Sequence, residues 1–376
     1  MKLLDPLAMV AADWPAGSER LRALAEAFVR DGSESFIGNL RTRVMVLSAE
    51  EWALPVTINE ADYGNCYVCS PHTAYAPYAK EELRLIKSGA ARIALGVLAD
   101  AAGAMLKAAR INRIVHVNNW MLSTNLYPAG AELPVEAIAE FLAEQFPEHF
   151  ICFRSLNAWS DAALLEEFKA AGYKFVASRQ VYCYERLAET WAMTANARED
   201  RRLFSRTDYV VVSGPELGEE DYARMAELYR LLYIEKYSSH NPVFTARYLR
   251  LCHESGVMRF FGLRGRGGIL DGVLGLFIID GIVTAPVVGY DTARDRSLGL
   301  YRLLMMVGFE FARKEGHRIN LSSGAAEFKR LRGGQPFIEY SAIYDRHLSL
   351  GRRAAVSTLA AVANGLGVPL MRKLKL

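Results

Sequence analysis

The chain has few cysteines, and their spacing does not form a covalent or metal framework. Five are scattered along 376 residues: Cys66, Cys69, Cys152, Cys183 and Cys252. An odd, scattered set is not typical of a disulfide-rich domain, and Cys66-x-x-Cys69 has no second pair with which to complete a zinc site. The histidines are not spaced as metal ligands either. The sequence therefore predicts free thiols and no bound metal.

Long apolar runs and a nucleophile motif are also missing. Residues 354–371 carry no charge, but they include Ser, Thr, Asn, Gly and Pro and are too polar for a stable membrane span. No G-x-S-x-G sequence is present, which argues against a serine hydrolase. We expect a cytoplasmic protein whose contact with the inner membrane face is peripheral.

The overall composition is that of an ordinary folded protein. Hydrophobic residues make up 51% of the chain and charged residues 23%, which excludes disorder of the bulk of the chain. The length suits about two domains. A net charge of only +3 gives no reason to expect a nucleic-acid partner.

Positive charge is concentrated at the end of the chain. Residues 346–376 contain six basic residues and no acidic one, so the rest of the chain is mildly acidic. Arg352 and Arg353 precede the uncharged stretch, and Arg372, Lys373 and Lys375 follow it. Such a tail suits an interfacial segment on an anionic membrane or a helix packed on its own domain. We favour the membrane.

Two parts of the sequence echo each other. Residues 149–155 (HFICFRS) resemble residues 317–323 (HRINLSS), and Glu-Phe-Lys recurs at 167–169 and 327–329. Matches that recur in the same order predict two copies of one α/β unit. We place the domains at 1–190 and 205–348, with the basic tail at 349–376 and a charged linker at 198–206.

The second half shows a clear order of elements. A strand at 209–212 is followed by helices at 219–233 and 242–253 and by strands at 258–263, 269–279 and 282–289. A long helix at 298–314, a strand at 318–321, a short helix at 325–331 and a strand at 337–344 complete it. In the first half, we expect an irregular segment at 53–78 and one helix at about 78–109.

This order, with the stretches GYDTARDRSLGLYRLL and INLSSGAAEFKRLRG, resembles the GNAT acyltransferase superfamily. It is similar to the branch with tandem copies, which includes the Fem-like and BioF2-like acyltransferase domains. The resemblance is good over the second half and degenerate over the first. It implies an α/β fold with a mixed sheet, made of two tandem GNAT-like domains and the helical tail.

The turn before the long helix is a candidate anion site. Free backbone N–H groups and the helix dipole favour an anion at a helix N-terminus, and Arg296 adds a fixed positive charge. The resemblance implies that Arg296-x-x-Gly299 binds the pyrophosphate of acyl-CoA as co-substrate, with no tightly bound cofactor. Tyr301 replaces a small residue of the family pattern, so an acyl carrier protein stays open as the donor. The predicted donor-binding residues are Arg296, Ser297, Leu298, Gly299 and Leu300.

Acyl transfer to an amine requires a base, donors for the oxyanion and a proton for the leaving thiolate. His240 lies in a polar loop between two helices, and its imidazole suits base chemistry near neutral pH. Tyr290 and Asp291 end the strand before the anion turn, and Lys329 matches a lysine of the BioF2-like pattern. Each has a structural alternative. His240 is then a surface loop residue, Asp291 caps a turn, and Lys329 is a solvated residue of a helix.

Polar and aromatic residues in the first half are candidates for acceptor binding. The sequence His116-Val-Asn-Asn-Trp120 follows a buried strand, and strand ends often carry ligand sites in α/β sheets. The alternative is a satisfied buried network that supports the fold. The predicted acceptor-binding residues are His72, Tyr75, His116, Asn118, Asn119, Trp120 and Ser322.

The leading hypothesis is an N-acyltransferase that uses a thioester donor and a lipid-like amine. Within that class, the sequence is similar to bacterial ceramide synthases, which acylate a long-chain amino alcohol. The first alternative is a Fem-like transferase that uses aminoacyl-tRNA. The second is a non-catalytic module that binds lipid or protein.

Overall fold

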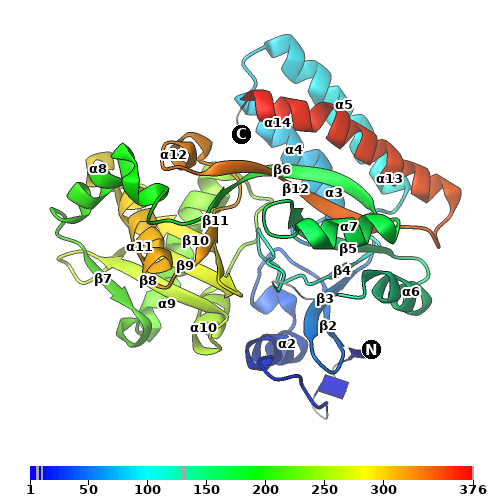
Figure 1. Ribbon diagram of the computed structural model, residues 1–376, viewed down its shortest axis with the longest axis horizontal. Coiled ribbons are helices and arrows are strands. Elements are labelled where there is room, and N and C mark those ends of the chain that lie inside the picture. Colours follow the sequence, from blue (N-terminus) through cyan, green and yellow to red (C-terminus); the bar gives the residue numbers. More distant parts are fainter. Residues whose placement is uncertain (6–7, 10–11, 129–132, 375–376) are drawn as a thin grey trace.

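Both halves of the chain contribute to one mixed sheet. The computed structural model describes residues 1–5, 8–9, 12–128 and 133–374 (Figure 1). Twelve strands lie in the order β1-β2-β3-β4-β5-β12-β6-β11-β10-β9-β8-β7, and helices cover both faces. The predicted α/β class with a mixed sheet is confirmed.

The first copy begins with an antiparallel meander, crosses over through a helix to a parallel strand, and ends in a long strand. Its elements are β1 (Lys2–Leu4), β2 (Arg43–Ser48), β3 (Ala53–Asn59), β4 (Ile114–Val117), α6 (Val135–Gln145), β5 (Phe150–Asn157), α7 (Ala162–Ala170) and β6 (Lys174–Tyr184). Helix α2 (Glu19–Asp31) packs on the meander.

The second copy repeats this order of elements. It consists of β7 (Val210–Ser213), β8 (Met258–Arg264), β9 (Leu270–Ile279), β10 (Ile282–Tyr290), α11 (Leu300–Lys314), β11 (Arg318–Asn320), α12 (Ala326–Arg330) and β12 (Gln335–Tyr344). Helices α9 (Glu219–Tyr229) and α10 (Ala246–Glu254) precede its meander strands β8–β10 and pack against them. The predicted tandem repeat is therefore confirmed.

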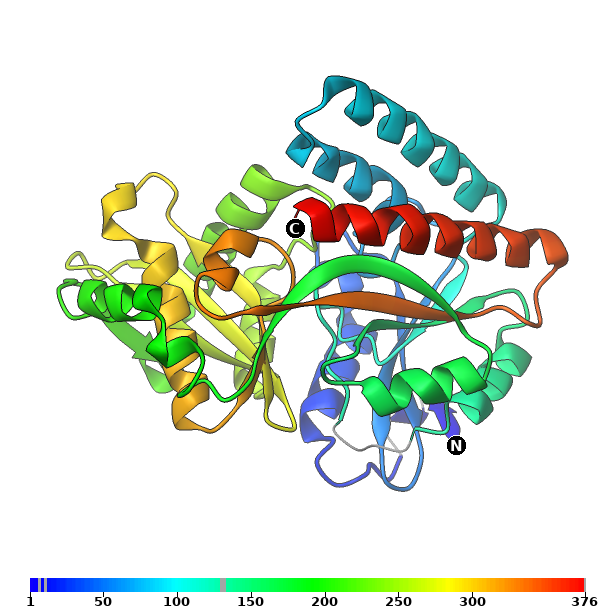
Figure 2. The same cartoon turned by 45° about the horizontal axis from the view of Figure 1, so that its top comes forward.

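The two copies exchange their last strands. β12 of the second copy pairs with β5 of the first, and β6 of the first copy pairs with β11 of the second. The exchanged strands also pair with each other over residues 174–183 and 335–343. Figure 2 shows these two strands crossing between the halves. Neither copy completes its own sheet, so the two fold as one structure.

Three local expectations were wrong. The expected linker at 198–206 falls largely within helix α8 (Ala195–Phe204), which packs against α11. Part of the segment expected to be irregular is the buried strand β3. The helix expected at 78–109 is interrupted: α4 (Ala79–Glu82) and the 3₁₀ turn η3 (Leu83–Leu85) precede α5 (Gly89–Ala108). The hydroxyl of Ser88 accepts from Ala91 N and begins α5 anew.

The C-terminal tail is a long helix that lies along β6. Its parts are α13 (Leu350–Val362), the π-helical turn η8 (Ala363–Gly367) and α14 (Val368–Leu374). The side chain of Asn364 accepts from Ala177 N at 3.0 Å and donates to Phe175 O at 2.8 Å. It thereby satisfies backbone groups on an edge of β6 that another strand does not cover. One face of the tail is thus packed on its own chain.

A buried ion pair joins the exchanged strands and generates a prediction. Arg179 Nε of β6 contacts Glu339 Oε1 of β12 at 2.8 Å. Because loss of one partner leaves a buried charge unpaired, we expect Arg179→Ala and Glu339→Ala each to lower the free energy of unfolding by about 3 kcal/mol. In urea unfolding, the double variant should lose less free energy of unfolding than the sum of the losses in the two single variants.

The exposed pair Arg318–Glu185 provides the matched control. Its removal should change the free energy of unfolding by less than about 1 kcal/mol. Strict additivity at Arg179 and Glu339 would contradict the role given to the buried pair.

Candidate active site

The sheet divides between β10 and β11. These parallel strands pair only at Ile282–Arg318 and Val283–Ile319. β11 then ends at Asn320, whereas β10 continues to Tyr290, paired with β9 on its other side and bulged between Thr284 and Val287. The side of β10 that faces β11 therefore has backbone groups that no described strand pairs. Such an edge can add an extended ligand that carries amides.

Two buried polar side chains, Thr284 and Asn320, follow the point where β10 and β11 separate, which we call the vertex of the split. Thr284 and Asn320 follow the last paired residues in register, so their side chains lie on the same face. Both residues are 0% exposed. Thr284 Oγ1 and Asn320 Nδ2 make no hydrogen bond to the residues that the structure describes. Because buried polar groups are rarely left unpaired, these two are candidates for contact with a ligand.

Close packing at Gly289 places a helix against the outer part of β10. A Cβ atom at Gly289 would lie 2.5 Å from Tyr229 N, so only glycine allows this approach. The π-helix η6 (Arg230–Tyr237) begins directly after this crossing. From it, Lys236 Nζ donates to Tyr290 Oη at 3.3 Å. Lys236 was missed by the sequence analysis.

Asp291 is held in an ion pair at the start of the turn. Arg224 Nη2 contacts its Oδ2 at 2.8 Å, and Ala293 N donates to its Oδ1 at 2.9 Å. Partial burial acts to raise the pKa of Asp291, but these hydrogen bonds outweigh burial and lower it below the ordinary value. A carboxylate with these partners is a weak base.

The turn that was predicted to bind an anion does precede α11. Asp295 Oδ1 accepts from Ser297 N, and Gly299 has a φ of +62° that begins α11. No described side chain caps α11, so its first N–H groups stay available. Arg296 is exposed and forms no ion pair within the described part of the chain. Geometry and charge both suit a phosphate here.

A buried carboxylate fixes the position of this turn. Asp200 of α8 is 3% exposed and contacts Arg302 Nε in the first turn of α11 at 2.7 Å. It also contacts Arg332 Nε, beyond α12, at 2.6 Å. Asp200, which lies in the segment expected to be a linker, therefore joins the start of α11 to the residues that follow α12.

Tyr301 fills space beside the turn where the family pattern has a small residue. Its ring packs edge-on against Phe328 of α12, with centroids 4.9 Å apart. Tyr290 lies 6.4 Å from the same ring. Tyr301 thus packs between Tyr290 and Phe328. It does not cap the N–H groups at the start of α11.

Lys329 is buried and tied to the loop after β11. Its Nζ donates to the carbonyl oxygens of Leu321 at 2.7 Å, Ser322 at 3.2 Å and Ser323 at 2.8 Å. Burial, with the charge of Arg179, lowers the pKa of Lys329 to about 7. Lys329 therefore lies at the split, where it holds the loop that contains the predicted residue Ser322.

The corresponding place in the first copy is filled. After β4, Asn119 Oδ1 accepts from Arg154 Nη1 at 3.1 Å, and Asn119 Nδ2 donates to Thr57 Oγ1 at 2.8 Å. Asn118 Nδ2 donates to Leu126 O, and Asn118 Oδ1 accepts from Trp120 Nε1. Asn118, Asn119 and Trp120 are buried, and both amides are used within this network.

Three more predicted acceptor residues lie inside the first copy. Tyr75 Oη donates to Ser341 Oγ at 3.2 Å. His116 is 1% exposed, and its Nδ1 lies 3.4 Å from Asn59 Nδ2. Burial, with the charges of Lys107 and His240, lowers the pKa of His72 to about 4. The structure does not gather these residues at the split.

His240 lies at the junction of the two copies. Its Nε2 is 3.6 Å from Glu81 Oε1 of α4, and its backbone oxygen accepts from Tyr67 N. Asn39 also donates to the backbone oxygens of Ser239 and Asn241. The polar loop therefore joins the second copy to the first.

Tyrosines from both copies gather around this junction. Tyr67 and Tyr78 of the first copy lie 5.2 Å apart. In the second copy, Tyr229 stacks on Tyr233 at 4.8 Å, and Tyr237 follows at 5.9 Å. This group was missed, although the spacing of four residues in Tyr229-x-x-x-Tyr233-x-x-x-Tyr237 indicates a single helical face.

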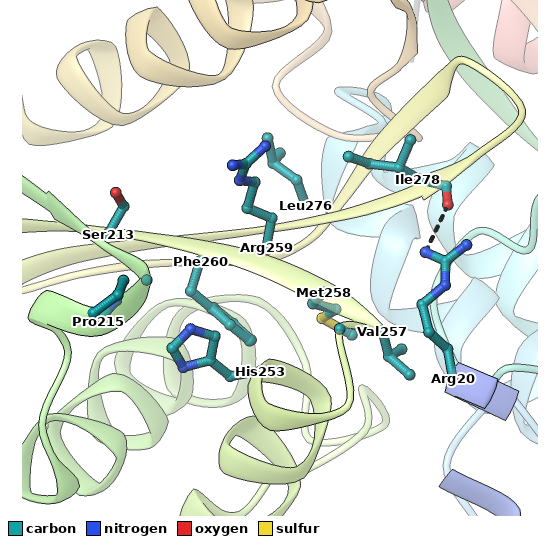
Figure 3. Close-up of a pocket in the computed structure, with 12 residues that line it drawn as sticks. Arg20, Ser213, Pro215, His253, Val257, Met258, Arg259, Phe260, Leu276 and Ile278 are labelled. Carbon is teal, nitrogen blue, oxygen red and sulfur yellow. Dashed lines mark hydrogen bonds between the residues drawn. The ribbon is translucent and has the colours of Figure 1, made fainter. Parts of the chain in front are cut away.

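A cavity of about 430 Å³ lies away from the split, where α2 of the first copy meets the second copy, and is lined by Arg20, His253 and Arg259, among others. Figure 3 shows that its polar side chains do not converge, and Arg20 donates to Ile278 O at 3.4 Å. It contains none of the predicted site residues. Among the described residues, no group of three His, Cys, Asp or Glu side chains could hold a metal ion.

The depressed pKa of His72 predicts sensitivity to acid. The folded state binds fewer protons than the unfolded chain between about pH 4 and pH 6.5. Stability should therefore fall as the pH is lowered through this window, and His72→Gln should reduce that fall in urea unfolding at pH 7 and pH 5. An identical fall in the variant would contradict the buried neutral imidazole.

Comparison with known proteins agrees with the architecture. Residues 192–330 match the family model described as an acetyltransferase (GNAT) domain. No curated protein matches the chain. The solved structure of FemX is 9% identical, with 92% of this chain and 98% of that chain covered and a TM-score of 0.52.

Two further structures have lower scores. The C-terminal domain of a putative lysylphosphatidylglycerol synthetase from Agrobacterium fabrum is 14% identical, covering 63% of this chain and 81% of that chain, with a TM-score of 0.45. A tandem GNAT protein from the clavulanic acid biosynthesis pathway is 11% identical, covering 89% of this chain and 92% of that chain, with a TM-score of 0.37. Residues 192–330 thus match a GNAT domain model, and the fold resembles that of FemX over nearly the whole chain.

Proposed function

We propose that the protein is an N-acyltransferase that moves an acyl group from a thioester to the amine of a lipid-like acceptor. One observation carries the proposal: the open edge of β10 leads from a buried polar vertex to the uncapped start of α11. The family match over this region favours transferase activity. The second copy would hold the donor, because the corresponding place in the first is filled by Asn118, Asn119 and Arg154.

The open edge suits the pantetheine arm shared by acyl-CoA and acyl carrier protein. Thr284 and Tyr290 are separated by six residue steps, or about 20 Å of strand. Amides of the arm can pair with the edge of β10, and its phosphate can meet Arg296 and the N–H groups of α11. The thioester would then lie near the vertex.

At the vertex, Asn320 Nδ2 and Thr284 Oγ1 can donate to the thioester oxygen as negative charge develops there. The acceptor nitrogen forms a bond to the carbonyl carbon, and the carbon–sulfur bond breaks. The proton lost by the amine balances the one gained by the leaving thiolate. Lys329 of α12 has a pKa of about 7, and its Nζ contacts the loop that follows Asn320. It is the titratable group that we assign to proton transfer.

This arrangement changes the roles expected for Tyr290 and Asp291. Both lie at the far end of the edge, beside the anion turn and Arg224. We assign them to donor binding, together with Lys236. Their distance from the vertex argues against direct contact with the reacting carbon.

The acceptor would enter at the tyrosine-lined junction of the copies. Aromatic rings offer apolar area together with hydroxyl groups, which suits a long-chain base with an amine and hydroxyls near one end. His240, which the sequence predicted as the base, lies at this junction, and we assign it to acceptor binding instead. Ser322, on the loop that Lys329 holds, keeps its assignment to acceptor binding. This ceramide synthase-like assignment, like the role of the tail as a membrane contact, is part of the proposal.

The principal alternative is a Fem-like transfer from aminoacyl-tRNA. It is favoured by the similarity of fold to FemX over both copies. Ribonuclease would abolish activity in that case and would have no effect on a CoA-dependent reaction.

The direct test is thiol release from palmitoyl-CoA, with and without sphinganine, combined with mass spectrometry of the product. We expect release that depends on the amine and yields N-palmitoylsphinganine. If thiol is not released from palmitoyl-CoA or from a palmitoylated carrier protein with any long-chain amine, the proposal fails.

Arg296 tests the donor site. Arg296→Ala should raise the KM for palmitoyl-CoA about tenfold with little effect on kcat, because it removes binding shared by the ground and transition states. Arg266→Ala is the matched control, since Arg266 is an exposed arginine on a different hairpin. Equal donor kinetics for both variants would remove Arg296 from the site.

Thr284 tests the vertex. Thr284→Val keeps the shape and removes a hydroxyl without a described partner, so stability should be unchanged or higher. We expect kcat to fall by about tenfold or more with little change in KM. Thr57→Val removes a buried hydroxyl that is hydrogen-bonded. It should lower stability by about 1 kcal/mol and spare kcat, and unchanged kcat in Thr284→Val would contradict the assignment.

A further inference from the structure

We propose that α5 and the C-terminal helix α13–α14 together form a docking face for an anionic lipid bilayer. This extends the membrane contact beyond the basic tail to a second helix. The docking face is inferred from exposed side chains and charges. Only its purpose, the delivery of a lipid-like acceptor, depends on the proposed function.

Helix α5 presents an apolar stripe that the protein leaves uncovered. Ile93 is 72% exposed and Val97 is 64% exposed. The stripe recurs every three or four residues along the outer face, at Ala90, Ile93, Ala94, Val97, Ala101, Ala104 and Ala108. A continuous exposed apolar surface of this kind marks a contact with a partner or a membrane.

The C-terminal helix adds a second apolar surface on the same side of the molecule. Leu350 is 79% exposed and Leu366 is 57% exposed. In both views α5 and α13 lie on the same side, over β6 (Figures 1 and 2), and the two helices are in contact. We therefore treat their outward faces as one surface in this proposal.

By length and composition alone, both helices could cross a membrane, so the expectation that the tail is too polar for a span was wrong on that measure. The C-terminal helix, however, is bound to β6 through Asn364 and buries Val356 and Leu359 against the sheet. A helix packed in this way lies on a bilayer rather than across it. We therefore assign both helices to the interface.

The charges around this face select anionic lipid. Arg92 of α5 and Arg372 and Lys373 of α14 are exposed and form no ion pair among the described residues. Asp100, the acidic residue of α5, is paired with Lys80 at 2.7 Å. Unpaired cations beside an apolar surface bind anionic headgroups, at about 1 kcal/mol for each residue near the membrane.

A shallow groove of about 370 Å³ on α5 combines both features. Ile93, Val97 and the backbone at Gly96 form its apolar lining, and Lys80, Asp100 and Arg92 also line it. The apolar part suits an acyl chain. Because Lys80 is paired with Asp100, Arg92 is the cation of the groove that a phosphate can contact. This complementarity favours a phospholipid over a second protein chain as the occupant.

The docking face adjoins the proposed acceptor entrance. The elements just before α5 contact the second copy: Arg84 Nη1 donates to Tyr237 O at 3.3 Å, and Glu81 faces His240. A lipid amine at the bilayer surface is therefore next to the tyrosine-lined junction. Docking would deliver an acceptor without its transfer through water.

Vesicle flotation of the full chain tests the inference. We expect the protein to float with phosphatidylcholine vesicles that contain phosphatidylglycerol, and to float less with phosphatidylcholine alone or at high salt. The double variant Ile93→Glu/Val97→Glu should bind about tenfold more weakly or worse, since it places charges in the apolar interface. Ile269→Glu, at a site 58% exposed on a hairpin of the second copy, should bind as the parent does.

Three outcomes would overturn the inference: no flotation of the parent protein, equal flotation of the double variant, or loss of binding in Ile269→Glu. A dimer that the double variant abolishes in sedimentation velocity, without vesicle binding, would also overturn it and assign the face to self-association. Amine-dependent thiol release with soluble short-chain substrates is measured separately. The double variant should keep it, so failure of docking and failure of the acyltransferase proposal are distinguishable.

Discussion

The exchange of β6 and β12 is the constraint on which the rest of the structure depends. Each copy ends in a strand that completes the sheet of the other, and Arg179–Glu339 joins the two strands in the interior. Because β6 pairs with β11 only near its end, β11 stays short and can diverge from β10. The open edge of β10 is thus a product of the whole chain rather than of the second copy alone.

The two copies share a topology but differ at the equivalent strand end. In the first copy, Asn119 is hydrogen-bonded to Arg154, and Asn118 is hydrogen-bonded to Trp120 and to the backbone of Leu126. In the second, Thr284 Oγ1 and Asn320 Nδ2 are buried without a described hydrogen-bond partner, and Arg296, in the turn before α11, forms no ion pair with the described residues. A protein tolerates unsatisfied groups mainly where a ligand completes them, which is why we assign the donor to the second copy.

Sequence reasoning predicted what local pattern and repetition determine. The element order around α11, the tandem repeat and the turn at Arg296–Gly299 all agree with the structure, whereas anion binding at that turn stays a prediction. It missed features that depend on distant residues: the exchanged strands, the joining role of Asp200 and the polar vertex. The motif at 116–120 looked like a ligand site because amides at a strand end suit either binding or internal satisfaction. Only the positions of Arg154 and Thr57 decide between them.

The central claim is that a thioester donor lies along β10 of the second copy. Hydrogen exchange with a non-hydrolysable thioether analogue of palmitoyl-CoA measures this directly, because backbone amides that pair with the arm become protected. The account predicts slower exchange in residues 284–302 and no change in residues 115–126. Protection in the first copy, or in neither copy at saturating analogue, would contradict it.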